Sequence, residues 1–301
     1  MCERFTTSKL KDFEDLKAIN TFGFRGEALA SITHVARVTI LTKTASSACA
    51  FKAKYSDGKL VPLKIGGKAE PKPMAGAVGT TITVEDLFYN MQTRRQAFKN
   101  SEEYLRILDV MTRYSIHYGD SKIAMTCKKS GQHIPDLHCP TNSSSKENIR
   151  ITYGNSVARE LMPVDFKLGY DDGEADAVAT STNNGGGGGG GGDDDDDDDD
   201  DEHHHQHEDS NSGRLIVSVK GLITSVNYSN RKAIYVFFIN NRLVECAKMK
   251  DTIESVYADI LPKYSHPFVY LSLTMPPNHL DVNVHPNKKE VQFLYEESLT
   301  G

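Results

Sequence analysis

A low-complexity tract divides this sequence into two parts that could each fold. From about Tyr170 to Gly213 the chain reads through "NNGGGGGGGG", a run of aspartates and "EHHHQHED", with almost no apolar side chains. Such a composition cannot bury enough apolar surface to offset the entropy lost on ordering it. We therefore expect residues 170–213 to form a disordered Gly/Asp/His-rich insert between two folded blocks.

The acidic tract also conceals the charge of the remaining sequence. The formal net charge is −6, but residues 193–209 contribute −12 of it, so the remainder of the chain carries +6. A mildly basic body is compatible with a phosphate-rich partner, although an ordinary solvated surface can carry the same excess.

Length and composition favour two ordinary domain cores without a membrane segment. The chain has 301 residues, of which 38% are apolar, and the longest clear apolar run is "AIYVFFI" at 233–239. This run is far shorter than a bilayer span, and "MCERFTTSK" lacks the apolar segment of a signal peptide. We expect a soluble, non-secreted chain.

The cysteines indicate reduced thiols and no metal centre. There are five of them, an odd number, without any C-x-x-C pair. This pattern is typical of an intracellular protein rather than of a disulfide framework. A zinc site built from Cys127, His133, His138 and Cys139 is disfavoured because its ligands would be adjacent and irregularly spaced.

Hydrophobic periodicity predicts a mostly antiparallel sheet in the first block. The segments rich in β-forming residues are 35–43, 49–55, 60–65 and 80–86. Asp57-Gly58 supplies a hairpin turn between the second and third of them. A helix is expected to start at Asn100, and its apolar face is predicted to comprise Tyr104, Ile107, Leu108 and Met111.

The second block shows a strand, helix, strand succession. A short hairpin around Ser130-Gly131 precedes it, and residues 147–162 read as helical. Beyond the insert we expect strands at 214–223, 233–245 and 266–275, with a helix at 248–261 between the last two. The apolar face of this helix is predicted to comprise Met249, Ile253, Val256, Tyr257 and Ile260. Together these segments predict a βαβ unit.

The stretch "TFGFRGEALASI" at 21–32 places Gly23 and Gly26 just before a helix that should start near Glu27. Glycine lets another group approach the backbone closely, and the first N–H groups of a helix can hold an anion. Neither G-x-x-x-x-G-K-[ST] nor G-x-G-x-x-G occurs in the chain. Two alternatives are a plain loop-to-helix junction and the G-x-x-G loop of an RNA-binding KH domain.

Several long segments resemble one known family. They are "CERFTTSKLKDFEDLKAINTFGFRGEALASITHVARVTI", "GTTITVEDLFYNMQTRR", "FINNRLVE" and "HPFVYLSLTMPPNHLDVNVHPNKKEVQFL". In this order they are similar to the amino-terminal region of the MutL DNA mismatch-repair proteins, with the greatest similarity to the eukaryotic MutL homologue 1 group. The resemblance covers nearly the whole chain except the insert.

The resemblance implies an α+β fold in two domains. Residues 1–140 would be the second half of an ATPase sandwich of the gyrase, histidine-kinase and MutL type, truncated at its amino terminus. Residues 141–169 and 214–301 would form a ribosomal-S5-like transducer domain around the insert at 170–213.

The same resemblance assigns site residues. The cofactor-binding positions would be Thr7, Ser8 and Lys9 in a lid, Arg25, Gly26, Glu27, Ala28 and Leu29 at a phosphate-cradling helix start, and Thr80 in a strand. Lys288 would contact the terminal phosphate, where a positive charge stabilises the charge that develops during transfer to water.

The resemblance also indicates what this chain lacks. In the family the catalytic glutamate, the Mg²⁺-binding asparagine and the D-x-G-x-G adenine pocket all precede the segment that matches "CERFTTSK". We therefore expect a fragment without the catalytic base or the Mg²⁺ ligand, and Glu27 belongs to the phosphate loop rather than serving as the base.

The implied function is part of an ATP-dependent DNA mismatch-repair clamp. ATP and Mg²⁺ would be the cofactors of the intact parent, which is a weak ATPase. Its partners would be double-stranded DNA, a second MutL-type subunit in a heterodimer and MutS-type mismatch-recognition proteins, in the nucleus. The alternatives are a nonenzymatic DNA- or partner-binding fragment and another MutL paralogue.

Overall fold

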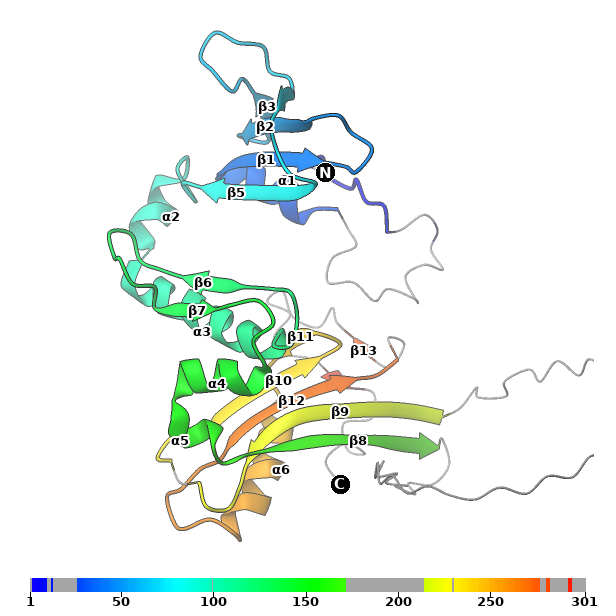
Figure 1. Ribbon diagram of the computed structural model, residues 1–301, viewed down its shortest axis with the longest axis vertical. Helices are drawn as coiled ribbons and strands as arrows, with labels where there is room; N and C mark the ends of the chain where they lie inside the picture. Colours follow the sequence, from blue (N-terminus) through cyan, green and yellow to red (C-terminus); the bar gives the residue numbers. More distant parts are fainter. Residues whose placement is uncertain are drawn as a thin grey trace, which may run out of the picture. The chain divides into compact units, whose positions relative to one another are not determined.

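The computed structural model describes residues 2–9, 12, 26–98, 100–171, 214–228, 230–276, 280–281 and 292–293 (Figure 1). These residues belong to two compact units. The first comprises 1–110 with 129–132, and the second comprises 111–128 with 133–301. The domain limits expected from the resemblance stay a prediction.

The first unit is built on an antiparallel sheet, as the sequence predicts. Its strands are β1 (Arg37–Lys43), β2 (Ala50–Ser56), β3 (Lys59–Val61), β4 (Lys72–Met74) and β5 (Gly79–Glu85). The order is β3-β2-β1-β5, with β4 also paired to β2. The turn between β2 and β3 is Asp57-Gly58, whose φ angles of 52° and 72° are those of a tight hairpin turn.

Helix α1 (Ala28–Val35) leads into β1 and covers part of this sheet. Val38 and Ile40 alternate with more exposed residues along β1, so one face of the strand is buried. Leu29 and Ile32 of α1 pack against that face. The helix therefore begins at the residue where the glycine-rich stretch predicts it, with Glu27 as its N-cap.

One predicted strand in this unit is shorter than expected. The segment 60–65 was expected to be extended throughout, but β3 ends at Val61. Pro62 follows and has no N–H for a sheet hydrogen bond, which explains the early end. Ile65 is fully exposed in the loop beyond it.

Helices α2 (Gln92–Ala97) and α3 (Asn100–His117) follow the sheet. The predicted start of α3 at Asn100 is confirmed. Its predicted apolar face is only partly correct, because Ile107 is 50% exposed. The buried apolar residue of α3 is Ile116, five residues beyond Met111, in the core of the second unit.

The second unit contains a five-stranded mixed sheet. Its strands are β8 (Leu161–Asp171), β9 (Arg214–Thr224), β10 (Ile234–Ile239), β11 (Arg242–Val244) and β12 (Phe268–Thr274), in the order β11-β10-β12-β9-β8. Strands β10 and β12 are parallel and are connected through α6 (Ala247–Ala258). The predicted βαβ unit is therefore confirmed.

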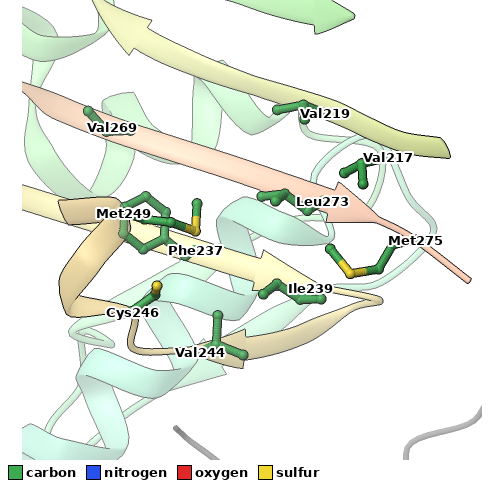
Figure 2. Close-up of a cluster of buried hydrophobic side chains, with 10 residues drawn as sticks. All are labelled: Val217, Val219, Phe237, Ile239, Val244, Cys246, Met249, Val269, Leu273 and Met275. Atoms are coloured by element: carbon green, nitrogen blue, oxygen red, sulfur yellow. The ribbon is translucent and has the colours of Figure 1, made fainter. Parts of the chain in front are cut away.

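Both faces of this sheet are buried, because apolar residues occupy consecutive positions in its central strands. On one face Phe237 and Val269 pack with Met249 of α6, as Figure 2 shows. On the other face Phe238 and Phe268 pack with helical residues of α3 to α5. A parallel pair covered on both faces reads in sequence as a continuous apolar run, as "IYVFFI" does.

The apolar face predicted for α6 is likewise only partly correct. Met249 is buried, and Ile253 and Tyr257 pack against the same core. Val256 and Ile260 are 56% and 51% exposed. The side chains that pack against the core, Met249, Ile253 and Tyr257, are four residues apart. The buried face of α6 is therefore narrower than the apolar face predicted from the sequence.

The helix predicted at 147–162 is interrupted. It consists of α4 (Ser145–Tyr153), capped by the Ser144 side chain, and the short α5 (Asn155–Ala158). Gly154 separates them with a φ of 93°, which a helix cannot accommodate. The chain then enters β8 at Leu161, a strand that the periodicity did not reveal.

The remaining elements are two short antiparallel strand pairs. Strands β6 (Met125–Cys127) and β7 (Leu137–Cys139) confirm the hairpin predicted around Ser130-Gly131, and β13 (Leu280–Asp281) pairs with β14 (Gln292–Phe293). The first two residues of the expected insert, Tyr170 and Asp171, belong to β8. The rest, 172–213, lies outside the described residues.

Candidate functional site

The start of α1 has the features of an anion-binding corner. Gly26 has a φ of 65°, which places the chain in the left-handed region just before the helix. Glu27 occupies the N-cap position without a side-chain cap, and the first turn contains no acidic residue. The N–H groups of Ala28 and Leu29 have no intrahelical acceptor, and the helix dipole adds positive potential.

The segment 2–9 lies directly against this corner. A β-carbon built on Gly26 would come within 2.4 Å of the Thr6 carbonyl oxygen. The glycine is therefore required for the close approach of another main chain, whereas the sequence analysis assigned its bare backbone to a phosphate group. In this structure the other main chain is that of Thr6.

Thr7, Ser8 and Lys9, which the resemblance assigns to a lid, follow Thr6 immediately in the sequence. Thr7 is half-buried, and its Oγ1 accepts a hydrogen bond of 3.2 Å from the main-chain N–H of Lys9. Ser8 and Lys9 are exposed. The structure brings Thr6 against Gly26 and Arg4 against Glu27, and the assignment of Thr7 to Lys9 and of Gly26 to Leu29 to one site stays a prediction.

Glu27 is engaged in an ion pair that sequence reasoning missed. Its Oε1 accepts hydrogen bonds from Arg4 at 3.3 Å (Nε) and 3.2 Å (Nη2). The assignment of Glu27 to the phosphate loop stays a prediction. Arg4 and Glu27 are far apart in sequence, so no local pattern could have identified the pair.

Thr80 is held by a separate contact. It lies on β5 opposite Thr42 of β1, and the two hydroxyl oxygens are 2.8 Å apart. Thr42 was not predicted as part of the site, although a pairing of the two predicted strands would have indicated it. Arg25 and Lys288, the other two predicted site residues, lie outside the described residues.

Cys2 anchors the beginning of segment 2–9 in the core. It is 7% exposed and belongs to the same apolar cluster as Val38 and Ile40. Burial raises the pKa of its thiol, and burial followed by the charge of Cys2 raises the pKa of the neighbouring Tyr55. Cys2 therefore remains protonated near neutral pH and acts as an apolar anchor.

Among the described residues, no three His, Cys, Asp or Glu side chains are grouped as a metal site. The Cys127 and Cys139 side chains are buried on the paired strands β6 and β7. His138 is exposed, and its Nδ1 lies 3.1 Å from the Thr126 hydroxyl. The arrangement is that of a small apolar hairpin.

Comparison with known proteins identifies the family of this chain. The chain is 40% identical over 300 residues to a MutL protein homolog 1 of Schizosaccharomyces pombe, covering 99% of this chain and 38% of that protein. It is 41% identical over 303 residues to the DNA mismatch repair protein Mlh1 of Dictyostelium discoideum, covering 99% and 32%. The chain belongs to the MutL family of DNA mismatch-repair proteins.

Two further findings agree with membership of the MutL family. The family described as "DNA mismatch repair protein, C-terminal domain" matches residues 200–301. The solved N-terminal domain of a DNA repair protein has the same fold, with a TM-score of 0.65 at 23% identity, over 97% of this chain and 76% of that one. The expected α+β fold is confirmed.

The MutL-family chain spans about a third of the length of its curated relatives. Within the part that the structure describes, no helix is both long enough and apolar enough to traverse a bilayer.

Proposed function

We propose that this chain contributes to an ATP-dependent, MutL-type clamp in nuclear DNA mismatch repair. The observation that carries the proposal is the contact of segment 2–9 with the start of α1, where the Thr6 main chain meets Gly26 and Arg4 pairs with Glu27. The hydroxyl and ammonium groups of Thr7 to Lys9 follow Thr6 in the sequence. Membership of the MutL family supports a role in DNA mismatch repair. The hydroxyl, ammonium and main-chain N–H groups proposed for the site suit a phosphate ligand.

The donors fit a triphosphate. The main-chain N–H groups at Ala28 and Leu29 would hold one phosphate, as helix N-termini do for anions. Lys9 would supply a positive charge, and Ser8 a hydroxyl donor. Arg4 neutralises Glu27, so the carboxylate at the N-cap does not repel the ligand. By the family resemblance Thr80 and Arg25 are further candidates for phosphate contacts, and the assignment of Lys288 to the terminal phosphate stays a prediction.

ATP would bind with Mg²⁺, for which we assign no ligand in this chain. When bound, the metal offsets phosphate charge. The chain's own residues orient the triphosphate through the α1 corner and through segment 2–9. Double-stranded DNA, a second MutL-type subunit and MutS-type proteins are the proposed partners, since the curated relatives are named for mismatch repair.

A second candidate is a DNA- or partner-binding module without hydrolysis. The +6 charge of the sequence outside 193–209 favours it, because basic surfaces bind the DNA backbone without nucleotide chemistry.

Calorimetric titration of the full chain with ATP and Mg²⁺ tests the proposal. Lys9→Ala should weaken ATP binding about tenfold, the size of a lost charge-assisted contact, and Arg25→Ala should also weaken it. Lys64→Ala is the control, because Lys64 is an exposed lysine in a distant part of the same unit's sequence. Equal affinity in all four proteins would refute the site. Absent ATP binding with retained DNA binding would favour the second candidate.

The assignment of Lys288 to the terminal phosphate can be tested in a longer MutL-type protein that contains this chain and hydrolyses ATP. Lys288→Ala should lower kcat more than it weakens ATP binding, because its charge matters most as the terminal phosphoryl group departs. Unchanged turnover would remove Lys288 from the site.

A further inference from the structure

Segment 2–9 is attached to the unit at its first residue. The Cys2 side chain is buried among Val38 and Ile40, and Leu29 of α1 packs against the same cluster. The beginning of the segment and the first turn of α1 therefore share one small core. A displacement of the segment would expose the Cys2 thiol to solvent.

The second attachment is steric. A β-carbon on Gly26 would approach the carbonyl oxygen, carbonyl carbon and nitrogen of Thr6 at 2.4, 2.7 and 2.9 Å. All three are main-chain atoms, which cannot move aside as a flexible side chain can. This contact is one of van der Waals packing between two main chains, and such packing alone does not fix the segment strongly.

The third attachment is the ion pair between Arg4 and Glu27. Two guanidinium nitrogens lie 3.2 and 3.3 Å from one carboxylate oxygen, and the Arg4 guanidinium also lies 4.9 Å from the centre of the Phe5 ring. Arg4 lies between the Cys2 anchor and the Thr6 contact. Glu27 lies between Gly26 and the free N–H groups of α1. The pair thus joins the two halves of the candidate site.

We infer that Arg4 and Glu27 are positioning residues that form a latch, which holds segment 2–9 docked with Thr6 against Gly26 at the start of α1. The inference rests on the proposed phosphate site and adds two residues to it. A ligand that contacts both halves binds the docked state. Its apparent affinity is therefore reduced by the fraction of molecules in which the segment is undocked.

The solvent exposure of the Arg4–Glu27 pair limits how strongly the pair can shift segment 2–9 towards the docked state. Side-chain exposures of 70% for Arg4 and 31% for Glu27 are those of a surface ion pair. Such pairs shift an equilibrium by about two- to fivefold. The latch therefore tunes the docked population and does not decide whether the unit folds.

The Cys2 thiol provides a readout that does not depend on nucleotide. The rate of Cys2 alkylation by iodoacetamide in the full chain, followed by peptide mass spectrometry, reports how often the segment undocks. Arg4→Gln and Glu27→Gln should each raise this rate about two- to fivefold. The double exchange Arg4→Glu with Glu27→Arg should restore it towards the original value.

Arg106→Gln provides a matched control. Arg106 pairs with Glu103 at 2.9 Å, with exposures of 72% and 32% that nearly equal those of the latch, but the pair lies within α3. This variant should leave Cys2 alkylation unchanged. If Arg4→Gln and Glu27→Gln also leave the rate unchanged, or if Arg106→Gln raises it equally, the latch is refuted.

Adding ATP with Mg²⁺ separates the latch from the proposed function. If both are correct, ATP slows Cys2 alkylation, and the latch variants bind ATP about two- to fivefold more weakly than the original protein. Faster alkylation in the variants without any ATP effect supports the latch and refutes the nucleotide site. Faster alkylation on adding ATP overturns the inference, because the ligand would then displace the segment.

Discussion

The imidazole of His117 stacks on the ring of Phe238, with 3.9 Å between the ring centres and 4° between the planes. His117 Nε2 lies 3.0 Å from Asn241 Oδ1, and its Nδ1 lies 3.1 Å from the Tyr270 hydroxyl. The amide oxygen can only accept, so Nε2 carries a proton and the Tyr270 hydroxyl donates to Nδ1. This arrangement fits a neutral imidazole at the edge of the core.

Stability of the second unit should therefore fall when His117 becomes protonated. Burial lowers the pKa of His117 below its ordinary value of 6.5. Between the lowered pKa and about 6.5 the unfolded chain binds more protons than the folded chain, so stability rises with pH in this window. The stability that depends on a neutral His117 is therefore lost progressively as the pH falls below about 6.5.

Urea unfolding at pH 7.5 and 5.5 measures this dependence. His117→Gln should reduce the difference in unfolding free energy between the two pH values. His138→Gln, a change at an exposed histidine on β7, should preserve it. An undiminished difference in His117→Gln would show that other groups cause the dependence.

A second prediction concerns Gly221 in the middle of β9. Its partner in β12 is Leu271, and a β-carbon on Gly221 would come within 2.1 Å of the Tyr270 carbonyl oxygen. Gly221→Ala should destabilise the second unit by about 1 to 3 kcal/mol, because main chain would have to shift. Thermal unfolding measures the change. Lys220→Ala at the neighbouring exposed position should cost less than about 1 kcal/mol, and equal losses would contradict the argument.

The sheets and the βαβ unit could be predicted because their signals are local. "VTILT" alternates as a strand covered on one face does, and "IYVFFI" is apolar throughout because α6 and the helices on the opposite face cover both sides of β10. Strand β8 was missed for a physical reason. Its sequence "LMPVDFKLGYD" contains a proline and three charged residues, as an edge strand can, and its partner β9 comes after the insert.

The candidate site was predictable only in part. Gly26 to Leu29 and Thr7 to Lys9 were identified through short motifs and the family resemblance. Arg4 and Thr42 were not, because each acts through a partner that is distant in sequence, Glu27 and Thr80 respectively. Such pairs depend on how the segments pack, and a single sequence contains no periodic signal for them.

A third prediction concerns Asn240 in the turn between β10 and β11. It has a φ of 45°, and its side chain both donates to the Met275 carbonyl oxygen at 2.8 Å and accepts from the Met275 N–H at 2.9 Å. Asn240→Ala should lower the unfolding free energy by about 2 kcal/mol, because both hydrogen bonds are lost and alanine tolerates positive φ poorly. Asn240→Asp should cost less, since it retains the acceptor. Chemical denaturation measures both, and equal costs would contradict this role of the acceptor.

The last prediction concerns the acidic tract. The β8 and β9 strands pair from Leu161↔Thr224 to Asp171↔Arg214, so the intervening residues 172–213 only have to connect two adjacent strand ends. Removing residues 185–209 should change the unfolding free energy by less than about 1 kcal/mol, because loop-closure cost changes by only about 0.6 kcal/mol per doubling of length. A loss of folding would show that the tract is part of the structure.

The same deletion tests whether the tract competes with DNA. It removes the −12 contribution and leaves a body of charge +6, which a tethered polyanion can approach in place of DNA phosphates. DNA affinity should therefore increase on deletion at about 50 mM salt. The increase should disappear at about 200 mM, where charges separated by more than roughly 8 Å are screened. If the original chain and the deletion variant bind DNA with equal affinity at both salt concentrations, the tract is only a connector. A competing polyanion would weaken DNA binding at low salt and lose this effect as the salt concentration rises.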